Sequence, residues 1–181
     1  MKRPTEASDC LAKPKVYLAG FDVFRPNAIE HGNYLKTLCA SVGLEGLYPL
    51  DNALPADIKG AEAARWICMK NMQMLSQSDA VVANLGAFRG QEPDSGTVFE
   101  MGAAVAMGIP VWAYFPEMVP MRRQVTTDHK GRCRDGYLVE DFDLPKNLML
   151  ACQWAGASQS VESAISDLAA YLEAARRLFR S

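Results

Sequence analysis

Several motifs that mark common nucleotide-binding and metal sites are missing from this sequence. Neither GxGxxG nor GxxxxGK[ST] occurs, so there is no glycine-rich cradle for a dinucleotide or a triphosphate. The two histidines, His31 and His129, lack the neighbours expected of a zinc site or a Ser-His-Asp triad. We therefore expect no metal and no cofactor, and catalysis that depends on carboxylates, hydroxyls and amides. Such groups are typical of glycosyl chemistry.

Paired cysteines, long apolar runs and strong charge are also lacking. The five cysteines show no CxxC spacing, and we interpret them as reduced thiols in a cytoplasmic protein. No apolar run has the length of a membrane span, and the first residues lack the apolar core of a secretory signal. A net charge of −2 argues against binding to a nucleic-acid polymer. We expect neither membrane insertion nor nucleic-acid binding.

What the sequence does contain is a regular alternation of apolar strands and amphipathic helices. We expect a flexible tail over residues 1–14 and a single domain over 15–181. The alternation predicts an α/β fold with a doubly wound sheet of about five mostly parallel strands and helices on both faces. A long polar loop over 116–136 has a length that is often functional. Strands are predicted at 15–20, 46–50, 79–85, 109–115 and around Trp154, and helices at 28–42, 61–77, 97–107, 144–150 and 161–178.

Two carboxylates, Asp94 and Glu100, stand where the third predicted strand leads into a helix. Open α/β folds bind their ligands at such junctions. The positive end of the helix favours an ionised carboxylate, which makes Glu100 a candidate nucleophile or base. A plainer interpretation is also open, because Thr97-x-x-Glu100 fits a capping box in which the Glu side chain only returns to the backbone.

The short motifs around this junction, taken together, match a known family in order and spacing. Over about residues 15–150 the pattern resembles the nucleoside 2-deoxyribosyltransferase family. The matching residues are Val16-Tyr17-Leu18-Ala19-Gly20, Val23-Phe24, Pro49-Leu50-Asp51-Asn52, Asn71, Ser78-Asp79-Ala80-Val81-Val82-Ala83, Phe88-Arg89-Gly90-x-Glu92-Pro93-Asp94-x-Gly96-Thr97-x-Phe99-Glu100-x-Gly102 and Leu144-Pro145-x-Asn147-Leu148-Met149.

The resemblance implies a flavodoxin-like fold and exchange of 2-deoxyribose between nucleobases, a reaction of nucleotide salvage. In the family, the residue matching Glu100 attacks the anomeric carbon of a 2'-deoxynucleoside and forms a covalent deoxyribosyl-enzyme. A second base then takes the sugar, and water does so slowly when no base is present. Tyr17 matches the residue that orients this nucleophile, and Asp94 matches one that accepts a hydrogen bond from the 5'-hydroxyl. Because a carboxylate repels a phosphate dianion, Asp94 favours nucleosides over nucleotides.

The same resemblance assigns four further residues to substrate binding. Phe24 matches the aromatic residue that packs on the base, with Phe21 as a nearby substitute, and Asp51 follows the second strand. Asn147 matches a residue that reaches into a neighbouring subunit, which implies a homo-oligomer with shared active sites. Asn71 is a departure, because several members carry an Asp here that protonates the departing base. An amide cannot act as a general acid.

Two other functions remain open. The first is an N-glycoside hydrolase that acts on 2'-deoxynucleosides or their 5'-phosphates. Residues 93–100 also resemble the PGGxGTxxE motif of phosphoribohydrolases that release cytokinin bases, but they lack its paired glycines. The second is a non-catalytic nucleoside-binding domain, in which Glu100 serves only as a helix cap.

Overall fold

The computed structural model describes residues 12–178, so Cys10 and most of the expected N-terminal tail lie outside the described part. A five-stranded sheet with strand order β2-β1-β3-β4-β5 forms the centre, and every neighbouring pair is parallel. This is the flavodoxin-like order, whose topological switch point lies between β1 and β3. The predicted α/β fold is therefore confirmed. The strands are β1 (Lys15–Ala19), β2 (Glu45–Leu47), β3 (Ala80–Asn84), β4 (Val111–Tyr114) and β5 (Gly156–Ser158).

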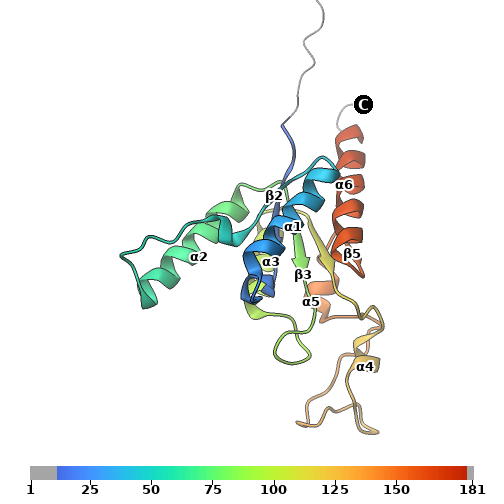
Figure 1. Cartoon of the computed structure of the whole chain (residues 1–181). Helices are drawn as coiled ribbons and strands as arrows, with labels where there is room; N and C mark the ends of the chain where they lie inside the picture. Colours follow the sequence, from blue (N-terminus) through green and yellow to red (C-terminus); the bar gives the residue numbers. More distant parts are fainter. Residues whose placement is uncertain (1–11, 179–181) are drawn as a thin grey trace, which may run out of the picture.

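Helices cover both faces of the sheet (Figure 1). One face carries α1 and α6, and the other carries α2, α3 and α5. No helix within residues 12–178 combines the length and apolar character needed to cross a bilayer. The helical segments are η1 (Phe21–Phe24), α1 (Ala28–Ser41), η2 (Pro49–Asp51), α2 (Gly60–Ser76), α3 (Ser95–Ala106), α4 (Met121–Gln124), α5 (Leu148–Ala151) and α6 (Val161–Leu178).

Alternation along β1 decides which side chains reach the candidate site. Val16 and Leu18 pack with α1 and α6, whereas Tyr17 and Ala19 join the core that includes Met101 of α3. Successive side chains of a strand point to opposite faces of a sheet. Tyr17 therefore lies on the same side of the sheet as the helix that carries Glu100.

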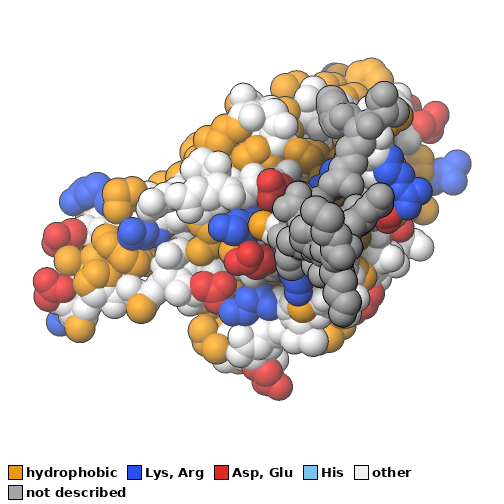
Figure 2. Space-filling view, turned by 90° about the horizontal axis from the view of Figure 1, so that it is seen from above, with side chains coloured by type: hydrophobic (Ala, Val, Ile, Leu, Met, Phe, Trp, Pro, Cys, Tyr) orange, Lys and Arg blue, Asp and Glu red, His pale blue; other side chains and the backbone are white. Residues whose placement is uncertain are grey.

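Helix α2 extends away from the sheet (Figure 1), and apolar side chains are exposed at this projecting end of the molecule (Figure 2). Leu54, Ile67 and Met69 are among the exposed large apolar residues of this region.

Several predicted boundaries were wrong, and in three cases a side chain that caps a turn or a helix explains the difference. The second strand ends at Leu47, since Tyr48 N donates to Asp51 Oδ2 at 2.9 Å and starts η2. Helix α3 begins at Ser95, two residues early, because Asp94 is its N-cap. Helix α5 begins only at Leu148, so Pro145 lies before it rather than in its first turn. The expected loop 116–136 contains the short helix α4.

Candidate active site

Tyr17 and Glu100, which are 83 residues apart in the sequence, meet through a short hydrogen bond. Tyr17 is fully buried on β1, and its hydroxyl donates to Glu100 Oε1 at 2.5 Å. Glu100 lies in the second turn of α3, on the side of the sheet that Tyr17 faces. Parallel register and strand alternation thus bring a phenol and a carboxylate together near the switch point between β1 and β3.

The surroundings of this pair oppose ionisation of the carboxyl group only in part. Burial raises the pKa of Glu100, and the negative charge of Asp94 raises it further. Hydrogen bonding by Tyr17 and, more weakly, by Asn71 lowers the pKa again. Burial, followed by the charge of Glu100, raises the pKa of Tyr17 far above its usual value, so this phenol remains a proton donor. The result is a partly desolvated carboxylate with one strong, fixed donor, which suits a nucleophile.

Asp94 caps the helix that carries Glu100. Its Oδ2 accepts hydrogen bonds from Thr97 N at 2.9 Å and from Thr97 Oγ1 at 3.1 Å. The capping-box interpretation of Thr97-x-x-Glu100 is therefore wrong, because Asp94 is the cap and Glu100 bonds to Tyr17 instead. Within the described chain, nothing donates to Asp94 Oδ1, so this oxygen retains its capacity to accept a hydrogen bond.

Asn71 faces the same cluster from α2. Its side chain contributes a hydrogen bond that lowers the pKa of Glu100, while its Oδ1 is buried and has no hydrogen-bond partner among residues 12–178. Buried polar atoms in proteins are nearly always paired. An unpaired acceptor beside the carboxylate is thus a candidate contact for a bound molecule.

Aromatic rings from two loops form a stack at the same edge of the sheet. The Phe21 and Phe24 rings both stack on Phe88, with centroid distances of 4.9 Å and 5.5 Å. The Arg89 guanidinium lies over the Phe24 and Phe88 rings. Phe24 remains 58% exposed, so it offers a flat apolar surface to solvent. The sequence had suggested Phe24 and its substitute Phe21, but not Phe88 or Arg89 as their partners.

Asp51 and Asn147, two other predicted site residues, are occupied elsewhere. Asp51 accepts hydrogen bonds from Tyr48 N and from Lys36 Nζ, and so ties η2 to α1. Asn147 is the N-cap of α5: its Oδ1 accepts from Met149 N at 3.0 Å.

Glu140 provides the second partner of Asn147, because its carboxylate accepts from the Asn147 side-chain amide. Asn147 also lines a cavity of about 1130 Å³ that adjoins the start of α3, and neither Tyr17 nor Glu100 is among its lining residues. Within one subunit, the structure therefore brings together Tyr17, Glu100, Asp94 and Asn71, but not Asn147.

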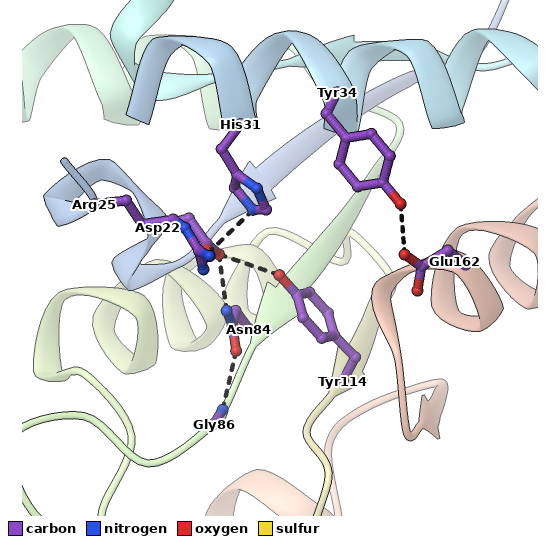
Figure 3. Close-up of polar contacts among 8 residues, drawn as sticks. All are labelled: Asp22, Arg25, His31, Tyr34, Asn84, Gly86, Tyr114 and Glu162. Carbon is purple, nitrogen blue, oxygen red and sulfur yellow. Dashed lines mark hydrogen bonds and ion pairs between the residues drawn. The ribbon is translucent and has the colours of Figure 1, made fainter. Parts of the chain in front are cut away.

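Sequence reasoning missed a buried carboxylate in η1. Asp22 is 3% exposed and lies at the centre of the polar network in Figure 3. An Asp between Phe21 and Phe24, two residues after Gly20, was the available signal. Among residues 12–178, no group of three His, Cys, Asp or Glu side chains is arranged to hold a metal ion.

Comparison with known proteins places these features in a family. The family model described as nucleoside 2-deoxyribosyltransferase matches residues 16–149. An uncharacterized protein of Schizosaccharomyces pombe is 34% identical over 120 residues, which cover 61% of this chain and 57% of the relative. The chain therefore spans little more than half the length of that relative.

Solved structures agree with this placement. A 2-deoxyribosyltransferase from Leishmania mexicana is 33% identical and has a TM-score of 0.72, with 86% of this chain and 97% of that chain covered. A 2-deoxyribosyltransferase from Bacillus psychrosaccharolyticus shares the fold at 18% identity and a TM-score of 0.57, with coverage of 83% and 90%. Because the family model covers most of the chain, the protein belongs to the nucleoside 2-deoxyribosyltransferase family.

Proposed function

We propose that this protein transfers 2-deoxyribose between nucleobases through a covalent deoxyribosyl-Glu100 intermediate. The observation that carries the proposal is the hydrogen bond from Tyr17 to a partly buried Glu100 at the switch point of the sheet. Such a bond holds one carboxylate oxygen and leaves the other to attack. Membership of the nucleoside 2-deoxyribosyltransferase family supports the same reaction.

The reaction proceeds by two displacements at C1' of the sugar. In the first, the Glu100 carboxylate forms a bond to C1' while the bond from C1' to the base nitrogen breaks, and the electron pair leaves with the base, which takes up a proton from water. In the second, a nitrogen of the incoming base attacks C1', releases the Glu100 carboxylate and loses its proton. Two inversions give net retention, as in retaining glycosidases. Water can replace the second base, which gives slow hydrolysis.

The neighbours of Glu100 recognise the rest of the nucleoside. Asp94 Oδ1 accepts a hydrogen bond from the 5'-hydroxyl, while Oδ2 continues to cap α3. Asn71 Oδ1, which is buried and unpaired within the described chain, accepts a hydrogen bond from the base or the sugar. Phe24 supplies an exposed ring for packing against the base.

A second subunit completes the site in this proposal. Exposed Tyr137, Leu138 and Met149 surround the cavity that Asn147 lines, and apolar burial is the main driving force of association. When a partner docks there, Asn147 exchanges its bond to Glu140 for a contact with the partner's nucleoside. The homo-oligomer thus has active sites shared between subunits, and no cofactor takes part.

An exchange assay tests the proposal. The donor is 2'-deoxyinosine, the acceptors are adenine, cytosine and thymine, and products are separated by chromatography. We expect new deoxynucleosides from the native protein and none from Glu100→Ala or Glu100→Gln. Glu173→Ala, at an exposed glutamate of α6, is the matched control and should retain full activity.

The assay also separates the competing functions. Free hypoxanthine without any new nucleoside would assign a hydrolase. Exchange that persists in Glu100→Ala would refute the nucleophile. Mass spectrometry of the protein mixed with donor alone should show an added deoxyribosyl unit, and this unit should be absent from the Glu100 variants.

A further inference from the structure

Asp22 is a buried carboxylate to which the proposed reaction gives no role. Its Oδ2 accepts from Asn84 Nδ2 at 2.8 Å and from Tyr114 OH at 3.2 Å, and its Oδ1 lies 3.2 Å from both Arg25 NH1 and His31 Nε2. Figure 3 shows these partners converging from β3, β4, α1 and the turn after η1. Buried carboxylates are rare and persist only where partners replace the lost water. The Asp22 carboxylate therefore links η1, α1, β3 and β4 at the carboxyl edge of the sheet.

The bond between Asp22 and Asn84 fixes two loops at once. Asp22 belongs to η1, which carries Phe21 and Phe24. Asn84 ends β3, and its Oδ1 accepts from Gly86 N at 3.1 Å, which sets the direction of the loop that carries Phe88. One pair of side chains thus determines how the two halves of the aromatic stack approach each other.

The backbone at Gly20 packs closely against Asp22 and Asn84, which supports a fixed geometry of their hydrogen bond. A Cβ added at Gly20 would lie 2.9 Å from both Asp22 Oδ2 and the Asn84 Cβ. Burial raises the pKa of Tyr114 well above its usual value, and the neighbouring Asp22 adds to this, so Tyr114 remains a donor to the carboxylate. The network has little room for rearrangement.

We propose that Asp22 is a positioning residue for the nucleobase, which acts through Asn84 by holding Phe24 and Phe88 in stacking register near the Tyr17–Glu100 pair. This inference rests on the proposed function. Phe24 follows β1 and Phe88 follows β3, the two strands that flank the switch point, whereas Tyr17 lies within β1. A shift of either loop should therefore change the aromatic stack and leave the Tyr17–Glu100 pair in place. Loss of the link should weaken binding of the base and leave the chemical step nearly intact.

The test compares Asp22→Asn, Asn84→Ala and the double variant Asp22→Asn/Asn84→Asp. The double variant exchanges the two side chains, so an amide at 22 can donate to a carboxylate at 84 that still accepts from Gly86 N. We expect Asp22→Asn and Asn84→Ala to raise KM for 2'-deoxyinosine about tenfold, with kcat within about threefold of native. The double variant should restore the native KM. Tyr34→Phe, which removes a surface bond to Glu162 in the same view, is the matched control and should leave KM unchanged.

A binding measurement separates this inference from the proposed function. Calorimetric titration of 2'-deoxyinosine into Glu100→Ala should give a Kd that Asp22→Asn weakens by the same factor as KM. If the native protein makes no new nucleoside, the transferase proposal fails, yet this titration still tests Asp22.

Unchanged KM and Kd in Asp22→Asn would overturn the positioning role. So would a lower kcat and melting temperature at native KM, since that pattern marks a purely structural residue. Failure of both Asp22→Asn and Asn84→Ala to fold would also overturn it, because the network would then be a requirement of folding.

Discussion

Removal of one hydroxyl group, in Tyr17→Phe, should shift the pH dependence of the reaction towards higher pH. The ring fills the same buried volume, so the change is confined to the donor that contacts Glu100 Oε1 at 2.5 Å. Burial already raises the pKa of Glu100, and the Tyr17 bond is the larger of the two hydrogen bonds that lower it. Without that bond the pKa rises further, and a smaller fraction of the enzyme carries the ionised nucleophile at a given acid pH.

The size of the shift follows from the strength of a hydrogen bond to a charged group. Such a bond contributes about 1.5–3 kcal/mol, and one pKa unit corresponds to about 1.4 kcal/mol. The acid limb of kcat/KM, which reports ionisation in the free enzyme, should therefore move upward by about 1–2 pH units in Tyr17→Phe. Activity on the alkaline plateau should fall less than activity at acid pH.

The assay is release of free base from 2'-deoxyinosine, followed from acid to neutral pH in native protein and Tyr17→Phe. Tyr34→Phe is the control, because it also removes one tyrosine hydroxyl, but from an exposed bond to Glu162 that does not involve Glu100. An acid limb that stays in place while activity falls uniformly would refute the reasoning, since it would leave Tyr17 with a purely geometric role.

Three further substitutions test Asp94 and Asn71, the neighbours of the proposed nucleophile Glu100. Asp94→Ser should keep α3 capped and raise kcat/KM for 2'-deoxyinosine 5'-phosphate relative to 2'-deoxyinosine about tenfold, as charge repulsion is removed; an unchanged ratio would count against the electrostatic argument. Asp94→Ala, in contrast, should lower the free energy of unfolding in urea by about 0.5–2 kcal/mol. Asn71→Asp supplies a proton donor beside the departing base and should increase the initial burst of free base at acid pH, up to about 100-fold; a slower burst would show that the amide is needed as it stands.

The fold was predictable because hydrophobic alternation is a local property of the chain. The apolar run of β3 is typical of a parallel strand that is buried on both faces. Alternation along β1 separates Tyr17 from Val16 and Leu18, and Tyr17 faces the helix that carries Glu100. Element boundaries were less predictable, because single side chains decide them. Asp94 and Asn147 each start a helix, and nothing in the local pattern distinguishes a residue that caps a helix from one that binds a substrate.

The aromatic stack and the burial of Asp22 were not predicted from the sequence, for a different reason. Phe24 and Phe88 lie on separate loops, and their stacking depends on how two strand ends are spaced. Asp22 reads as an ordinary polar loop residue, since its partners Asn84 and Tyr114 come from other strands. Only the three-dimensional register shows that this carboxylate is buried.

Asp94 and the proposed nucleophile Glu100 are six residues apart at the start of α3, and each carboxylate has a separate partner. Asp94 Oδ2 accepts from Thr97 N and so caps the helix, which leaves the Glu100 side chain free to bond to Tyr17. The same negative charge raises the pKa of Glu100, which keeps this carboxylate more basic than a solvated one. Because the folded-state pKa is raised, Glu100 contributes stability below the usual glutamate pKa, and this contribution is lost as pH rises through the raised value. Ionised Glu100 is thus held at a cost to stability, and the Tyr17 hydrogen bond limits that cost while, in the proposed reaction, the other oxygen attacks the sugar.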